Sequence, residues 1–157
     1  MSQNLGISKK EAEEIIKRYF EVYSGVKAWT EQIMESANVL GKVETLAGRT
    51  RFIPELFSKN FAVKQAGERM AVNTPVQGSA ADICKAAMIN IADDMDSRPH
   101  LKSKMLLQIH DELVFECPQD EVEEMVELVT EHMENGWKLD VPLLVSVGVG
   151  SNWQEAK

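Results

Sequence analysis

At 157 residues, with 44% hydrophobic and 27% charged residues, the chain has the composition of one soluble globular domain that can bury most of its apolar surface. It contains no apolar run of about 18 residues, and its polar N-terminus lacks the apolar core of a secretory signal, so we expect no membrane span and a cytoplasmic location. The formal net charge of −8 argues against a free-standing nucleic-acid binder, because affinity for phosphates comes mainly from lysine and arginine.

The charge is distributed unevenly along the chain. Residues Lys42 to Arg69 include six basic and three acidic side chains, whereas His110 to Asp140 include eleven acidic side chains and only Lys138 against them. A nucleic-acid-facing side in the first stretch and a solvated back in the second would reconcile the net charge with phosphate binding. The alternative is that both are solvated faces, which is the interpretation we prefer for the acidic stretch.

The first predicted elements are two helices. Residues 8–11, Ser-Lys-Lys-Glu, form a capping-box pattern that predicts a helix start. An apolar stripe at helical spacing follows, made of Ala12, Ile15, Ile16, Tyr19, Phe20 and Tyr23. Ser24 and Gly25 are expected to end this helix, and the apolar pattern of a second one stops at Gly41. The short connection predicts an antiparallel helix hairpin.

A β-hairpin is predicted next, from residues 42–45 and 51–53 joined by a glycine-containing loop. Its arginines, Arg49 and Arg51, could reach DNA phosphates or could be ordinary surface residues. Leu56 to Val63 has no clear period and is expected to be a loop.

The longest helical stretch is predicted from Val63 to Met95. Pro75 should kink or break it, because proline lacks a backbone donor. One face of its second half is expected to be core, and it contains Ala80, Cys84, Ala87, Met88, Ile91 and Met95.

Three polar side chains in this stretch, Arg69, Asn73 and Gln77, recur every four residues. If the helix continues through Pro75, they form a row of hydrogen-bond donors along one side. The minor-groove edges of all base pairs offer acceptors, so such donors could inspect a duplex without reading its sequence. The alternative is a polar helix face or a buried side-chain network, and spacing alone leaves both open.

Lys104 to Glu116 reads as two short apolar strands that form a buried hairpin, with His110, Asp111 and Glu112 at its turn. Carboxylates at the end of a rigid hairpin suit a hard divalent cation such as Mg²⁺, which takes oxygen ligands. The alternative is an ordinary turn, since aspartate and glutamate are common there.

After a polar loop at residues 96–103 and this hairpin, a helix is predicted from about Val122 to Met133, with Asp120 and Glu121 before it. It should pack on the sheet and leave its glutamates in water. Leu143 to Val149 alternates as a final strand. The predicted fold is therefore α+β: one domain over residues 1–157, with an antiparallel sheet covered by helices and an N-terminal helix pair. Cys84 and Cys117 lack metal-type spacing and are expected to be reduced thiols.

Two stretches carry a resemblance to a known family. Residues 108–116, Gln-Ile-His-Asp-Glu-Leu-Val-Phe-Glu, resemble the third signature motif of the family A DNA polymerases, the bacterial DNA polymerase I group. Residues 68–82, Glu-Arg-Met-Ala-Val-Asn-Thr-Pro-Val-Gln-Gly-Ser-Ala-Ala-Asp, resemble the duplex-binding helix of the same family. The likeness extends from about Leu5 to Trp153, with both motifs in the order of the family.

The resemblance implies most of a polymerase palm with helices from the fingers side, and DNA-directed DNA polymerase activity. It implies that Asp111 is a ligand for two catalytic Mg²⁺ ions, with Glu112 assisting and His110 near the primer terminus. It also implies that template–primer DNA and a deoxynucleoside triphosphate are the partners. The side chains expected to hold the minor groove are Arg69, Asn73 and Gln77.

Two motifs of that family do not occur in the sequence: the first metal-binding aspartate motif and the nucleotide-gripping helix. We therefore expect a C-terminal piece of a longer polymerase that needs a missing N-terminal segment, is inactive alone, holds little ordered metal, and exposes apolar palm surface through which it could dimerise. Two alternatives stay open: a non-catalytic DNA- or partner-binding fragment of a split polymerase, and a small metal-dependent phosphodiesterase that uses Asp111 and Glu112.

Overall fold

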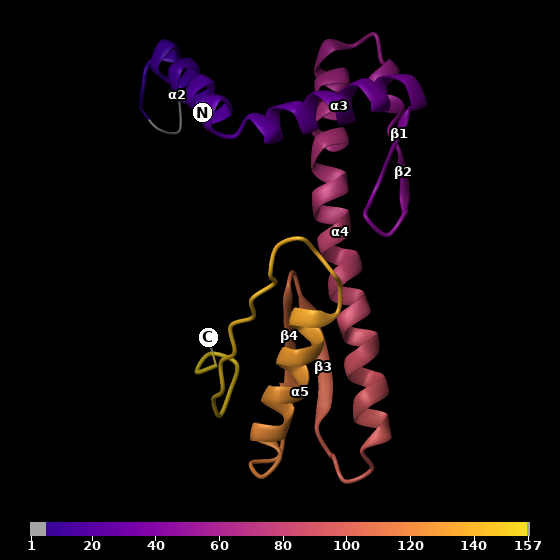
Figure 1. The fold of residues 1–157 in the computed structure, drawn as a ribbon, viewed down its shortest axis with the longest axis vertical. Coiled ribbons are helices and arrows are strands. Elements are labelled where there is room, and N and C mark those ends of the chain that lie inside the picture. Colours follow the sequence, from indigo (N-terminus) through magenta and orange to yellow (C-terminus); the bar gives the residue numbers. More distant parts are fainter. Residues whose placement is uncertain (1–5, 157) are drawn as a thin grey trace. The chain divides into compact units, whose positions relative to one another are not determined.

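The structure is a computed structural model that describes residues 6–156. Helices and two antiparallel β-hairpins make up the chain (Figure 1), which confirms the predicted α+β class. Contacts between residues divide it into two compact units, a first unit up to Val76 and a second unit from Gln77 onward. The single domain expected over residues 1–157 stays a prediction. None of the helices in the described residues combines the length and apolar character needed to cross a membrane.

Helix α2 (Lys9–Val22) begins where the capping box predicts. The Ser8 Oγ accepts the Glu11 N–H at 3.2 Å, and Glu11 Oε2 accepts the Ser8 N–H at 2.8 Å. These two bonds satisfy donors that the first helical turn leaves free. The capping pattern therefore sets the start of the chain's first described helix.

A single residue, Tyr23, separates α2 from α3 (Ser24–Leu40), so Gly25 lies inside the second helix and does not end the first. Figure 1 shows the two helices following one another with a bend, not lying side by side. The predicted antiparallel helix pair is wrong, because a one-residue link is too short to reverse the chain. The apolar stripe of α2 consequently stays half-exposed, with Tyr19 at 49%.

Helix α3 ends as predicted at Gly41, whose φ of 67° is left-handed. The predicted hairpin follows as β1 (Lys42–Glu44) and β2 (Thr50–Phe52), paired antiparallel. A 3₁₀ turn, η1 (Pro54–Phe57), occupies the start of the stretch expected to be a loop. The core of the first unit consists of Ala37, Val43, Ile53, Leu56 and Ala71.

Helix α4 (Phe61–Ser97) is the longest element and is continuous, with Pro75 inside it, so the proline does not break it. The predicted core face of its second half is largely confirmed by the buried residues Cys84, Ala87 and Ile91. Ala80, which was expected on that face, is exposed.

The second hairpin pairs β3 (Lys104–Ile109) with β4 (Glu112–Glu116) in antiparallel register. Its ladder shifts between Met105 and Leu107, so β3 carries one extra residue there, a β-bulge at Leu106. The hairpin is less buried than expected, because Leu106 is 53% and Leu107 44% exposed. Among the described residues, these two strands pair only with each other.

Helix α5 (Val122–Asn135) confirms the predicted helix, and its Met125 and Leu128 are buried. Glu121, just before it, was expected in water but is 8% exposed. Its carboxylate accepts the Ser103 hydroxyl at 2.6 Å and the backbone N–H groups of Lys102 and Ser103. The Ser103 hydroxyl, followed by these N–H groups, holds the pKa of Glu121 below its ordinary value. This carboxylate therefore joins the start of α5 to the start of β3.

Helix α5 runs antiparallel to the C-terminal half of α4. Near the end of α4, Arg98 Nη1 donates to Glu124 Oε1 at 2.7 Å. One turn earlier, His132 Nε2 lies 2.9 Å from Asp94 Oδ2. The residue number of the contact falls along α4, from 98 to 94, while it rises along α5, from 124 to 132. The two helices therefore pack antiparallel.

Acid is expected to weaken this helix pair. The Arg98 guanidinium, and after it His132, holds the pKa of Asp94 below its ordinary value of 3.8. His100, followed by Arg98, holds the pKa of Glu124 below 4.5. A carboxyl group whose pKa falls on folding adds stability above its unfolded-state pKa, and this stability is lost as the pH drops through the folded-state pKa.

We therefore expect the urea midpoint for unfolding to fall as the pH drops below 4.5. Arg98→Gln should lower the midpoint at pH 7 and flatten this fall, because both carboxylates lose a partner. Arg18→Gln, on an exposed side chain of α2, is the control and should change neither. Denaturation followed by circular dichroism at several pH values measures both effects. If the urea midpoint of Arg98→Gln fell with pH as steeply as that of the wild type, the prediction would be contradicted.

Leu143 to Val149 is not a strand, contrary to the prediction. Its alternating pattern describes which side chains could share a face, but a strand also needs a hydrogen-bonded neighbour. One backbone contact in this stretch is the Val145 N–H, which donates to Glu134 Oε1 at 3.0 Å. The stretch is therefore held in part by a side chain at the end of α5.

Candidate functional site

The β3–β4 hairpin has a two-residue turn made of His110 and Asp111, because Ile109 pairs directly with Glu112. His110 has a φ of 55°, a left-handed conformation that costs an ordinary residue about 1 kcal/mol or more. Gln108 supports the turn, since its Nε2 donates to the His110 carbonyl at 3.0 Å. The turn therefore presents its polar side chains from a defined backbone.

The three polar residues predicted at this turn, His110, Asp111 and Glu112, are all exposed. Asp111 lies at the turn itself, and Glu112 is the first residue of β4. Neighbouring strand residues point to opposite faces, so adjacent carboxylates at such a place diverge more than they converge. The described residues contain no group of three or more histidine, cysteine, aspartate or glutamate side chains that could hold a metal ion.

The tip of the hairpin is electrostatically coupled to α4. Burial raises the pKa of the Cys84 thiol, and the negative charge of Asp111 raises this pKa further. Gln77 precedes Cys84 by seven residues, about two helical turns, so both belong to one face of α4. Asp111 is thus close enough to Cys84 on α4 for its charge to act on the thiol.

The other two predicted duplex-contacting residues, Arg69 and Asn73, belong to the first unit and are exposed on α4. They line a shallow groove of about 440 Å³. Its remaining lining residues are Met34, Gln65, Glu68 and Val72. Gln77, the third residue of the predicted row, belongs to the second unit. The groove leaves the tips of Arg69 and Asn73 accessible to a ligand.

Arg51 has partners that sequence reasoning did not anticipate. From β2 it donates to Thr74 Oγ1 at 3.2 Å and approaches Met70 Sδ at 3.3 Å. Arg51 and Thr74 are 23 residues apart in the sequence, and no local pattern pairs them. Their contact ties β2 to the turn of α4 that follows Arg69.

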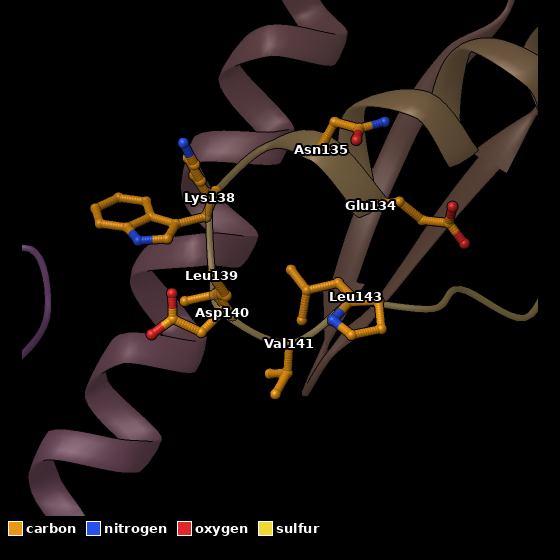
Figure 2. Close-up of a pocket in the computed structure, with 9 residues that line it drawn as sticks. Glu134, Asn135, Lys138, Leu139, Asp140, Val141 and Leu143 are labelled. Carbon is orange, nitrogen blue, oxygen red and sulfur yellow. The ribbon is translucent and has the colours of Figure 1, made fainter.

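A second pocket, of about 290 Å³, lies at the end of α5, and none of the predicted site residues line it. Figure 2 shows its lining, with Glu134 on one side and Lys138 and Asp140 on the other. All its lining residues fall within 134–143, so it is formed by the last residues of α5 and the loop that follows. We assign it no role.

The chain thus combines an α+β fold with exposed acidic residues at the tip of the β3–β4 hairpin. Residues 1–155 match the model of DNA polymerase family A. The chain belongs to this family.

Its relatives are bacterial DNA polymerases I. It is 50% identical over 157 residues to DNA polymerase I of Bacillus subtilis (strain 168). The aligned region covers 100% of this chain and 18% of that protein. It is 51% identical over 160 residues to the thermostable DNA polymerase I of Thermus filiformis, with the same coverage. The chain thus spans about a fifth of the length of these relatives (18%).

A solved structure, the POL domain of Pol1 from M. smegmatis in complex with DNA primer-template and dNTP, is similar to the chain with a TM-score of 0.94 and 46% identity. The similarity covers 99% of this chain and 27% of that one.

Proposed function

We propose that this chain forms the part of a template-directed DNA polymerase that holds the primer–template duplex and supplies one carboxylate to the metal site. The observation that carries the proposal is the exposed Asp111 at the two-residue turn of the β3–β4 hairpin, close enough to α4 for its charge to act on Cys84. Similarity over 99% of the chain to a polymerase domain bound to primer–template and dNTP supports it. The cytoplasm is the compartment we propose.

Asp111 fits a Mg²⁺ ligand because its carboxylate oxygens are hard donors, exposed, and held on a short turn. Two bound Mg²⁺ ions would activate the primer 3′-hydroxyl and stabilise the departing pyrophosphate. Glu112 is the first residue of β4, one position after the turn, and would assist the site without direct ligation. His110, at the same turn, would lie near the primer terminus.

The polar row on α4 would hold the duplex through its minor groove. Arg69, Asn73 and Gln77 are exposed and each can donate a hydrogen bond. Purine N3 and pyrimidine O2 accept hydrogen bonds in every correctly paired step, so donors there test geometry without testing sequence. A copying enzyme needs this kind of contact.

We further propose that the 157 residues alone do not add nucleotides, because one aspartate at a hairpin tip cannot hold two cations between primer and nucleotide. The purified chain should bind a labelled primer–template duplex at low salt and incorporate no labelled nucleotide. Asn73→Ala should weaken duplex binding about threefold to tenfold, the effect of one lost hydrogen bond. Asn90→Ala, on an exposed asparagine of the same helix, is the matched control.

Fluorescence anisotropy measures the binding, and gel analysis of the primer measures incorporation. Incorporation by the purified chain would overturn its proposed dependence on other residues. Equal duplex affinities for Asn73→Ala and Asn90→Ala would contradict the proposal that the polar row on α4 holds the minor groove. Duplex binding without any part in synthesis would favour the alternative of a DNA- or partner-binding fragment of a split polymerase. Dimerisation through exposed apolar palm surface stays a prediction.

A further inference from the structure

Arg51 bridges two elements of the first unit. Its Nη1 donates to Thr74 Oγ1 at 3.2 Å, and its Nη2 lies 3.3 Å from Met70 Sδ. Met70 and Thr74 are four residues apart on α4, so they lie one above the other on the same side of the helix. The planar, forked guanidinium can meet both at once, which a lysine ammonium on a flexible stem does less well.

The bridged turn is a weak point of α4. Pro75 follows Thr74 directly and has no N–H, so it cannot make the helical hydrogen bond to the carbonyl of Ala71. A helix that lacks one bond opens more easily at that turn. The bond from Arg51 enters from outside the helix next to this position.

The base from which Arg51 reaches α4 is rigid. Arg51 pairs with Val43 across the β1–β2 ladder. Val43, and Ile53 two residues after Arg51, are buried in the core of the first unit. The Ile53 N–H also donates to the Gly41 carbonyl at 2.8 Å. The hairpin can therefore act as a fixed support for the side chain.

The two residues that Arg51 contacts are each next in sequence to a predicted duplex-contacting residue: Met70 follows Arg69, and Thr74 follows Asn73. We propose that Arg51 is a positioning residue that braces the turn of α4 from Met70 to Thr74, directly before Pro75, and so holds Arg69 and Asn73 in the geometry that duplex binding requires. This inference rests on the proposed function for the part that concerns DNA. Arg51 then acts through the helix and does not itself neutralise a phosphate.

The first measurement uses the free chain without DNA. Hydrogen exchange followed by mass spectrometry should show that amides in residues 70–78 exchange about threefold to tenfold faster in Arg51→Gln and in Thr74→Val, as expected for one lost hydrogen bond. The double variant should exchange no faster than Arg51→Gln alone, because Thr74→Val removes a bond that Arg51→Gln already removes. Thr74→Ser keeps the hydroxyl and should restore wild-type exchange. Unchanged exchange at 70–78 in both single variants would overturn the brace.

The second measurement is duplex affinity as a function of salt. A brace predicts that Thr74→Val, which leaves the protein's charge unchanged, weakens binding several-fold with the wild-type salt slope, and that Thr74→Ser does not. A direct phosphate contact predicts a different pattern: Thr74→Val has no effect, while Arg51→Gln lowers the slope of log affinity against log salt by about 0.9. That second pattern would overturn the positioning role.

The two measurements separate this inference from the proposed function. If the wild-type chain bound no duplex at all, the proposed function would fail, while hydrogen exchange in the free chain would still decide whether Arg51 braces α4. If the duplex bound but exchange at 70–78 did not respond to Thr74→Val, only the brace would fail.

Discussion

Replacing Asp111 by asparagine is expected to lower kcat about 10³-fold or more, since under the proposed function it removes a metal ligand and with it several kcal/mol of transition-state stabilisation. The activity to measure is that of a chimaera in which this chain replaces the corresponding residues of Bacillus subtilis DNA polymerase I, with which it shares 50% identity over 157 residues. Single-turnover incorporation on a primer–template gives the rate of the chemical step. Asparagine keeps the shape of the side chain and removes its charge, so a folding defect is not expected.

Two further variants of the same hairpin make this result specific. Glu116→Gln, at the far end of β4, is the matched control and should leave kcat within about twofold of the unsubstituted chimaera, because exposed substitutions usually have small effects. Glu112→Gln should have an intermediate effect, in keeping with an assisting role. An Asp111→Asn chimaera as fast as the Glu116→Gln chimaera would exclude Asp111 as a metal ligand.

Ile91→Ala is expected to destabilise the second unit by about 2–5 kcal/mol, the range for truncating a fully buried aliphatic side chain. Ile91 is 0% exposed, whereas Ile89, two residues earlier on α4, is 61% exposed. Ile89→Ala makes the same chemical change on the solvent side and should cost less than about 0.5 kcal/mol. Urea denaturation followed by circular dichroism measures both values.

The comparison tests whether the second half of α4 buries the face that the structure describes. Each kcal/mol lowers the melting temperature of a unit the size of residues 77–157 by about 4–8 °C, so thermal unfolding provides an independent check. Similar losses for Ile91→Ala and Ile89→Ala would contradict the assignment of the buried face.

Local patterns predicted the elements that local chemistry determines. The start of α2 depends on a hydrogen-bond exchange between Ser8 and Glu11, which are three residues apart, and the end of α3 depends on a left-handed glycine at position 41. The hairpin that carries Asp111 depends on two apolar runs and one turn. Such signals are contained in a few consecutive residues, so they can be read without knowing the fold.

The expectations that proved wrong depended on partners elsewhere in the chain. Whether α2 folds back on α3 was decided by Tyr23, a link too short for reversal. Whether Leu143 to Val149 forms a strand depends on a neighbour to pair with. Glu121 was assigned to water because glutamate usually is, but Ser103 and Lys102 satisfy its carboxylate.

The candidate site likewise contains residues that local patterns predict and contacts that depend on the fold. Asp111 and the row of Arg69, Asn73 and Gln77 could be nominated from the sequence, because a turn and a four-residue period are local patterns. The contact between Arg51 and Thr74 could not, because it joins residues 23 positions apart through the packing of β2 on α4. The influence of Asp111 on Cys84 is likewise a consequence of the fold.

The extra residue in β3 limits how the length of this hairpin can change. Across the bulge at Leu106, the side chains of Leu107 to Val114 keep a set orientation relative to those at the base of the ribbon. Deleting Leu106 would leave Leu107 paired with Val114 but would remove the local bend and extra twist that the bulge gives the ribbon, and so change the angle at which the turn presents Asp111. Natural insertions and deletions among relatives should therefore collect in the polar loop at residues 98–103 and be absent between Met105 and the turn.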